Sequence, residues 1–194
     1  RALANLALAF PEWPQERRKR VASAMWRNTG RMIAETLLLD KIVGDPSRVE
    51  VENRALLQQI FSEPGAHIGV SLHMGNWEIA GIACGMCGGQ LAGVYRPMRN
   101  PYLNNYLLDK RKPYYPAGLL FKRRNLREGL PVDAAAIAAI NILRNGGLLG
   151  LVCDQVDPDT DFTVPFFGVD AKFTMAPAIL ARHVNARIWI ARIM

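Results

Sequence analysis

Cysteine is scarce in this chain and long hydrophobic runs are missing. Three cysteines in 194 residues are an odd and sparse set, which excludes a small secreted scaffold held together by disulfides. No apolar run reaches the roughly 18 residues that a membrane-spanning helix needs, so the sequence predicts no crossing of a bilayer by these residues. Internal repeats and low-complexity linkers are also missing, which favours a single domain.

Two of the cysteines, Cys84 and Cys87, have the CxxC spacing of redox and zinc sites. Zinc needs two further ligands, and the remaining soft ligands are Cys153 and three histidines. Cysteine also packs well as a small buried residue. We interpret the pair in that way and predict no metal site.

The overall composition is that of a globular domain. Hydrophobic residues make up 50% of the chain and charged residues 21%, which excludes disordered, collagen-like and coiled-coil proteins. The length allows a substantial core. We predict one domain over residues 1–194, with a helical N-terminal part (1–63) and an α/β part (64–194). Because the chain begins at Arg1 and stops within an apolar run, we expect it to be truncated at both ends.

Acidic residues are nearly missing from one segment. Residues 96–127 contain nine basic residues and one acidic residue, Asp109, whereas the rest of the chain contains 15 basic and 16 acidic residues. The whole net charge of +7 therefore belongs to this segment. A local excess of this kind suits an anionic partner: nucleic acid, a phospholipid surface, a phosphorylated ligand or an acidic carrier protein.

Hydrophobic periodicity and turn residues predict alternating helices and strands in the last two thirds of the chain. Alternation of this kind indicates an α/β fold with a mainly parallel sheet flanked by helices. We expect helices over 2–10, 16–39, 49–61, 79–87, 101–112, 134–144 and 176–183, and strands over 66–72, 91–95, 148–153 and 186–193.

His73 and Glu78 stand where such a sheet places its chemistry, because His73 follows a predicted strand and Glu78 begins the next helix. A carboxylate bonded to one imidazole nitrogen makes the other a better general base. Backbone N–H groups near Gly75 and Asn76 would stabilise an oxyanion or bind phosphate. The plainer alternative is a hydrogen-bonded loop histidine and a surface glutamate at a helix start. The sequence has no GxSxG pattern, so a covalent acyl-enzyme is not indicated.

Residues 72–78 (LHMGNWE) resemble the HxxxxE block of the bacterial lipid A biosynthesis acyltransferases, the lauroyl/myristoyl family, which is related to the glycerolipid acyltransferases that use HxxxxD. Further blocks resemble the family in the same order and together cover nearly the whole chain. They are Asn5-Leu6 with Phe10-Pro11, Val94–Pro97 with Asn100-Pro101, Asp154-Gln155, Val164–Gly168, and then Ala171, Thr174 and Leu180–Arg182.

This resemblance implies a glycerolipid-acyltransferase-like fold and transfer of a fatty acyl chain, usually from acyl carrier protein, to a hydroxyl of an acylated, phosphorylated glucosamine disaccharide. It implies no metal, no organic cofactor, and a place on the cytoplasmic face of a bacterial inner membrane, with an anchor upstream of this chain. The acyl chain length, the exact hydroxyl and the choice of carrier protein or CoA as donor stay open.

The resemblance also implies roles for single residues. His73 would be the base and Glu78 its orienting partner, and Arg96 would bind phosphate or support the transition state. The other implied substrate-binding residues are Asn76, Asp154, Gln155, Phe167 and Gly168. The stretch around Phe167 would either line an acyl channel or pack under a loop.

The remaining basic residues of the segment would meet an anionic partner, or they would form a solvated face. They are Arg99, Lys110, Arg111, Lys112, Lys122, Arg123, Arg124 and Arg127. Acyl carrier protein and lipid head groups are the partners we expect for them. The apolar and aromatic residues 114–121 between the clusters belong either to the core or to a membrane interface.

Two other functions compete with lipid A acylation. The same chemistry would serve another glycolipid or an amino-acid lipid as acceptor. A non-catalytic module that binds nucleic acid or an anionic membrane is the alternative of a different class. Because most aromatic residues lie in apolar stretches and no nucleic-acid motif occurs, we predict no nucleic-acid partner.

Overall fold

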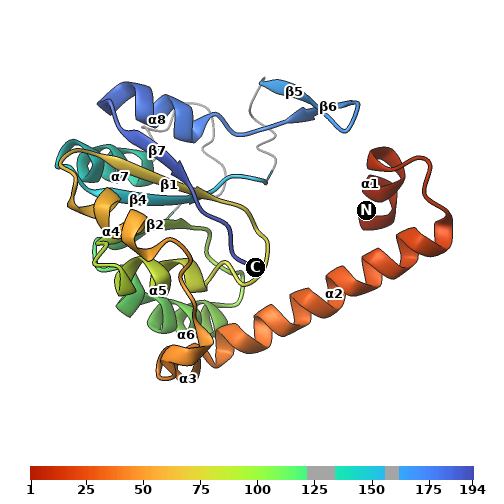
Figure 1. Ribbon diagram of the computed structural model, residues 1–194, viewed down its shortest axis with the longest axis horizontal. Helices are drawn as coiled ribbons and strands as arrows, with labels where there is room; N and C mark the ends of the chain where they lie inside the picture. Colours follow the sequence, from red (N-terminus) through yellow and green to blue (C-terminus); the bar gives the residue numbers. More distant parts are fainter. Residues whose placement is uncertain (122–133, 156–161) are drawn as a thin grey trace.

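The computed structural model describes residues 1–121, 134–155 and 162–194. Its centre is a five-stranded, entirely parallel sheet in the order β3-β2-β4-β1-β7 (Figure 1). The strands are β1 (His67–Ser71), β2 (Leu91–Tyr95), β3 (Gly118–Phe121), β4 (Leu148–Val152) and β7 (Arg187–Ile190).

Helices cover both faces of this sheet. On one face α7 (Ala134–Arg144) and α8 (Ala176–Val184) pack on Ile68, Ala92 and Leu149, which are fully buried. On the other face α4 (Arg54–Ser62) and α5 (Ile79–Met86) contribute Phe61 and Cys84 to a second cluster. Figure 1 shows α7 and α8 on the upper side of the sheet and α4 and α5 on its lower side. The predicted α/β class with a mainly parallel sheet is therefore confirmed.

Three glycines lie side by side on the α5 face of the sheet. Gly150 of β4 is in register with Gly69 of β1 and with Gly93 of β2. A Cβ atom on Gly69 would lie 2.7 Å from the ring of Trp189, and one on Gly93 would lie 2.5 Å from the ring of Tyr115. The missing side chains thus let two aromatic rings lie directly against the sheet.

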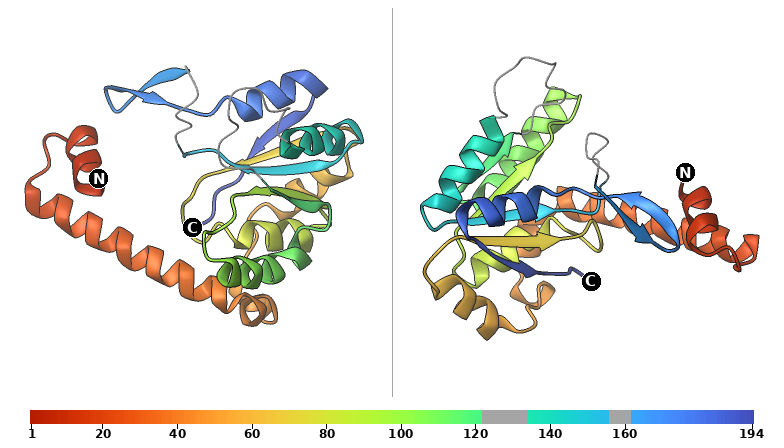
Figure 2. Two further views of the ribbon diagram at one scale, coloured as in Figure 1. Left: turned by 180° about the vertical axis from the view of Figure 1, so that it is seen from behind. Right: turned by 90° about the horizontal axis from the view of Figure 1, so that it is seen from above.

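The N-terminal region is helical, as predicted, and forms an arm. It consists of α1 (Ala2–Ala9), α2 (Gln15–Leu37) and α3 (Leu39–Val43), followed by the 3₁₀ turn η1 (Pro46–Arg48). The far end of α2 extends away from the sheet, and α1 folds back toward a hairpin of β5 (Thr163–Phe166) and β6 (Val169–Lys172) (Figures 1 and 2). Arm and hairpin meet where the rings of Phe10 and Phe167 lie 5.1 Å apart.

The near end of α2 packs on α6 (Pro101–Arg111), which continues into the 3₁₀ turn η2 (Lys112–Tyr114). Pro101 begins α6, and Asn100 caps it by accepting hydrogen bonds from the N–H groups of Tyr102 and Leu103. Among the described residues, no helix combines the length and the apolar character that a membrane crossing requires.

Two elements differ from the sequence prediction. Residues 118–121 form the edge strand β3, where we expected either core or interface residues without a strand. Residues 163–172 form the β5–β6 hairpin, for which no strands were predicted. The four-residue length of each of these strands gives too short a pattern for a strand to be recognised.

Candidate active site

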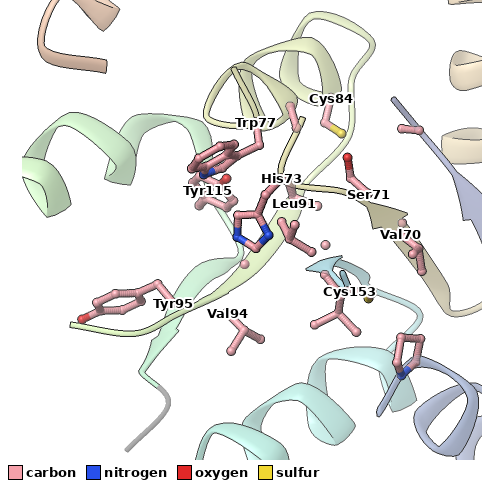
Figure 3. Close-up of a pocket in the computed structure, with 18 of the residues that line it drawn as sticks. Val70, Ser71, His73, Trp77, Cys84, Leu91, Val94, Tyr95, Tyr115 and Cys153 are labelled. Carbon is pink, nitrogen blue, oxygen red and sulfur yellow. The ribbon is translucent and has the colours of Figure 1, made fainter. Parts of the chain in front are cut away.

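A pocket of about 390 Å³ lies at the carboxyl ends of the parallel strands (Figure 3). Its polar lining comes from the segments that follow β1, β2 and β4 and from α6. Its apolar lining comes from both faces of the sheet, with Leu91 and Trp189 on the α5 face and Val70 and Leu151 on the α7 face. The lining includes the polar residues His73, Glu78, Arg96, Arg111 and Gln155 and, toward the sheet, Cys84, Leu91, Tyr115 and Trp189. This position is the one expected for ligands in parallel α/β sheets.

His73 is held by Asp154 through two contacts. One carboxylate oxygen of Asp154 lies 2.6 Å from Nδ1 of His73, and the other accepts a hydrogen bond of 2.9 Å from the backbone N–H of His73. The two residues are 81 positions apart but follow neighbouring parallel strands, where Ser71 is in register with Val152. Strand pairing therefore brings the two loops together.

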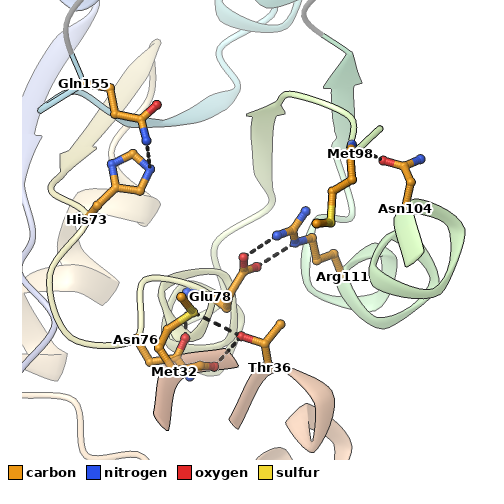
Figure 4. Close-up of polar contacts among 9 residues, drawn as sticks. All are labelled: Met32, Thr36, His73, Asn76, Glu78, Met98, Asn104, Arg111 and Gln155. Atoms are coloured by element: carbon orange, nitrogen blue, oxygen red, sulfur yellow. Dashed lines mark hydrogen bonds and ion pairs between the residues drawn. The ribbon is translucent and has the colours of Figure 1, made fainter. Parts of the chain in front are cut away.

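The carboxylate fixes the tautomer of the histidine. An ionised carboxylate only accepts hydrogen bonds, so Nδ1 of His73 carries the proton and the lone pair is on Nε2. The side-chain Nε2 of Gln155 lies 3.3 Å from that ring nitrogen (Figure 4). The edge of the Trp77 ring packs on the imidazole, with 4.8 Å between the ring centroids. The arrangement presents a basic nitrogen toward the pocket.

Glu78 does not contact His73, so the predicted pairing of these two residues is wrong. The Glu78 side chain is 6% exposed and forms a two-bond ion pair with Arg111 of α6, in which Nε of Arg111 lies 2.7 Å from a carboxylate oxygen (Figure 4). The physical reason is that the turn before α5 directs Glu78 toward α6, while Asp154 reaches His73 from the adjacent strand.

The same ion pair sets the protonation of Arg111. Burial on its own lowers the pKa of the guanidinium, but the hydrogen bonds and the negative charge of Glu78 outweigh it, so the pKa lies above its ordinary value. Arg111 therefore stays charged beside Glu78. Sequence reasoning placed Arg111 in a surface patch and missed this contact, because it joins two elements that are 33 residues apart.

Asn76 is buried outside the pocket lining and does not fit its predicted substrate-binding role. Its side-chain nitrogen donates to Glu35 of α2 at 3.0 Å, and its side-chain oxygen accepts from the backbone N–H of Glu78 at 3.2 Å. Both polar ends of the amide are thus used to attach the start of α5 to the arm. Gly75 beside it has φ 58°, and a Cβ there would lie 2.6 Å from the carbonyl oxygen of Ile193.

Arg96 follows β2 and lines the pocket with an exposed side chain. In the described ranges no carboxylate forms an ion pair with Arg96 or with Arg99, which is exposed outside the pocket. Arg96 therefore combines a place at the pocket with a positive charge that no carboxylate of the described residues pairs with.

The predicted anionic-partner patch is largely neutralised where the structure describes it. Lys110 pairs with Asp40, Arg111 with Glu78, and Lys112 with Asp109 at 2.9 Å. Arg111 in particular faces the interior rather than a partner. Lys122, Arg123, Arg124 and Arg127 lie outside the described residues.

Phe167 and Gly168 form the two-residue turn of the β5–β6 hairpin, with φ angles of 51° and 75°. Positive φ at both positions is the geometry of a type I′ hairpin turn. The Phe167 ring contacts Phe10 and Phe166, and neither turn residue lines the pocket. The structure thus places this block at the end of the arm instead of in an acyl channel.

The cysteines have the character of packing residues. Burial raises the pKa of the Cys84 thiol to about 12 and that of Cys153 to about 11, so both are protonated at neutral pH. Cys84 and Cys87 are buried and free. Across residues 1–121, 134–155 and 162–194, no group of three or more His, Cys, Asp or Glu residues is placed to hold a metal ion.

The deep part of the pocket is apolar. Leu91, Trp189 and Tyr115 surround it on the face where the three glycines lie. Tyr115 is enclosed, and burial together with the negative charge of Glu78 raises the pKa of its hydroxyl. The sequence offered no signal for this lining. Trp189 belongs to the edge strand β7, and Tyr115 lies just before β3, the strand at the other edge of the sheet.

Taken together, the pocket joins a carboxylate-held imidazole, an exposed arginine and an apolar interior. A histidine base with its lone pair on Nε2 can take a proton from a hydroxyl, and an arginine can bind phosphate. Comparison with protein families gives a match over residues 1–193 to the model described as bacterial lipid A biosynthesis acyltransferase. Comparison with curated proteins gives no match. The family match spans both the arm and the sheet with its pocket, and the chain belongs to the bacterial lipid A biosynthesis acyltransferase family.

Proposed function

We propose that the protein transfers a fatty acyl chain from the thioester of an acyl carrier protein to a hydroxyl of a phosphorylated lipid A precursor, with His73 as general base. The observation that carries the proposal is the double contact of Asp154 with His73, which leaves Nε2 as the proton acceptor. The family match supports acyl transfer as the reaction class.

In the proposed step, the acceptor hydroxyl loses its proton to Nε2 of His73 as its oxygen attacks the thioester carbonyl carbon. The C–S bond breaks, and the departing sulfur takes the proton from the imidazolium. The products are an ester and the free thiol of the carrier. The step uses no covalent acyl-enzyme, no metal and no organic cofactor.

Asp154 is the positioning residue in this proposal, in place of Glu78. Its carboxylate stabilises the imidazolium that forms and keeps the ring in one orientation. Glu78 acts through Arg111 by fixing the wall of the pocket on the α6 side. A direct role of Glu78 in the reaction stays a prediction.

Arg96 is the residue we propose for the phosphate of the acceptor. It lines the pocket, is exposed, and has no carboxylate partner among the described residues. A guanidinium binds phosphate oxygens through two parallel hydrogen bonds, which suits a phosphorylated sugar. The apolar interior would take the acyl chain, since Leu91, Tyr115 and Trp189 offer no charge there.

We further propose that the protein works on an anionic membrane, at the cytoplasmic face of a bacterial inner membrane. Helix α1 has no buried residue, and its Leu3 and Leu8 are 46% and 58% exposed. Helix α2 carries six basic and two acidic residues, and the exposed Phe166 and Phe167 stand near α1. Apolar and aromatic groups beside basic residues are the composition of an interfacial surface.

The test uses the full-length protein in vesicles that contain a phosphorylated lipid A precursor, with lauroyl-acyl carrier protein as donor. We expect His73→Ala to retain its fold by circular dichroism and to lose transfer by a factor of about 10² to 10⁴, the contribution of a general base. His183→Ala is the matched control, because this exposed histidine contacts Arg144 at the opposite end of the sheet. Transfer at the wild-type rate by folded His73→Ala would refute the base assignment.

A further inference from the structure

Gln155 occupies the position that the acceptor hydroxyl must take. Its side-chain nitrogen lies 3.3 Å from Nε2 of His73 (Figure 4), whereas Asp154 contacts the other ring nitrogen, Nδ1. Since Asp154 holds the proton on Nδ1, the Gln155 amide donates to the lone pair on Nε2. This is the same lone pair that the proposed reaction needs.

An imidazole nitrogen has one lone pair in the plane of the ring, so it accepts one strong hydrogen bond at a time. The acceptor hydroxyl and the Gln155 amide therefore exclude one another. Gln155 is exposed, so its side chain can leave Nε2 without opening the core. When the Gln155 side chain leaves Nε2, the protein loses one neutral hydrogen bond, and the net free energy of such a bond is small.

We propose that Gln155 is a positioning residue that occupies the base nitrogen until the acceptor displaces it, and that it thereby limits hydrolysis of the acyl thioester. The inference rests on the proposed function. Water is the competing nucleophile, because it also has an O–H that His73 can deprotonate. A specific acceptor is held by further contacts with the protein and can therefore displace the amide. A single water molecule has no such contacts and displaces the amide less readily.

The side reaction is written in the same terms as transfer. A water molecule gives a proton to Nε2 of His73 while its oxygen attacks the thioester carbonyl carbon. The C–S bond breaks, and the sulfur takes the proton from the imidazolium. The products are a free fatty acid and the thiol of the carrier, and no other reactant is needed.

The experiment compares wild type with Gln155→Ala in the full-length protein. Thiol release from lauroyl-acyl carrier protein is measured without acceptor, and ester formation is measured with the lipid A precursor. We expect Gln155→Ala to raise hydrolysis by a factor of about two to ten, the range of one neutral hydrogen bond, and to raise the ratio of hydrolysis to transfer. Gln58→Ala, at an exposed glutamine of α4, is the control and should change neither rate.

Two further measurements separate positioning from a structural effect. Gln155→Asn shortens the side chain by one methylene and should raise hydrolysis in the same direction. The ¹⁵N shift of Nε2 in labelled protein should differ between wild type, where the lone pair accepts from the Gln155 amide, and Gln155→Ala, where water takes the place of the amide. A wild-type hydrolysis ratio in Gln155→Ala, or a protonated Nε2 at neutral pH in wild type, would overturn the proposal.

Failure of the proposed function gives a different pattern. In that case wild type forms no ester, and His73→Ala releases thiol at the wild-type rate. If wild type forms ester and needs His73 but Gln155→Ala keeps the wild-type ratio, the function stands and the role of Gln155 is refuted.

Discussion

The carboxylate of Glu78 and the guanidinium of Arg111 form a two-bond ion pair with side chains that are only 6% and 20% exposed. The pair joins the start of α5 to the end of α6. The pair lies beside the pocket and supports its wall. The glutamate of the HxxxxE block thus binds Arg111, and the carboxylate that contacts His73 belongs to Asp154.

Removal of one partner of this pair should be costly. We expect Glu78→Gln or Arg111→Met to lower the free energy of unfolding by about 3–5 kcal/mol, because each leaves a charge without its partner in a buried place. Urea unfolding followed by circular dichroism measures this loss. The double variant should be more stable than either single variant, and additive losses would show that the two side chains do not interact.

Asp154→Asn should abolish most transfer while the fold is retained. The amide has no negative charge, and it offers one accepting oxygen where the carboxylate offers two to the backbone N–H and Nδ1 of His73. The histidine therefore loses the group that fixes its tautomer and stabilises the imidazolium. We expect a loss of about 10² to 10⁴ in kcat, the range for general acid–base catalysis. Asp109→Asn, at an exposed carboxylate paired with Lys112, is the control with unchanged kcat. An Asp154→Asn enzyme with wild-type kcat would refute the pairing as a functional one.

Membrane binding should depend on α1. We expect the double variant Leu3→Asp/Leu8→Asp to release the protein from vesicles of anionic phospholipid in a sedimentation assay, because it removes two exposed apolar side chains and adds two negative charges beside the basic α2. Leu56→Asp on α4 is the matched control, since that leucine is 55% exposed on another part of the molecule. Equal binding of both variants would contradict this assignment of the surface.

The glycine row should be sensitive to a single methyl group. In Gly93→Ala the new Cβ would lie 2.5 Å from the Tyr115 ring, so we expect a loss of about 1–3 kcal/mol in the free energy of unfolding and a reshaped pocket. Gly85→Ala in α5 has no atom within 4 Å of the new Cβ and should raise the free energy of unfolding by about 0.5–1 kcal/mol. Thermal unfolding of the two variants tests this contrast, which fails if both shift in the same direction.

Stability should fall above pH 9 because of Cys84. Its pKa rises from 9.0 to about 12 on folding, so the unfolded chain releases the thiol proton first. The contribution of the Cys84 thiol to the free energy of unfolding is therefore fully present below pH 9. It is lost as the pH rises toward 12, with a limiting slope of about 1.4 kcal/mol per pH unit. Urea unfolding at pH 8 and pH 10.5 should show a smaller pH effect in Cys84→Ala than in wild type. The same pH effect in both would contradict the assignment.

The order of strands and helices follows from short-range patterns in the sequence, whereas the partners of the site residues do not. Residues 66–72 and 148–153 each contain a run typical of a buried strand, and the structure has β1 and β4 there. The contact of His73 with Asp154 depends on β1 and β4 being neighbours, and this order is set by packing over the whole sheet.

The resemblance to the family pointed to the blocks around His73, Arg96 and Asp154, and the structure places all three at the carboxyl edge of the sheet. It could not tell whether Glu78 or Asp154 contacts His73, because a motif records spacing along the chain and not direction in space. Arg111 was missed as a partner for the same reason. Its charge was visible in the sequence, but its burial depends on how α6 packs.

The 81-residue separation of His73 and Asp154 has a consequence for biosynthesis. A contact between such distant positions forms only after the intervening chain has folded into β2, β3 and α7 and the central strand β4 has inserted between β1 and β2. A chain that is still being made, or one that has collapsed without its middle strand, has the histidine but not its partner. Such a chain lacks the contact that orients the His73 ring, and this orientation arrives together with completion of the sheet.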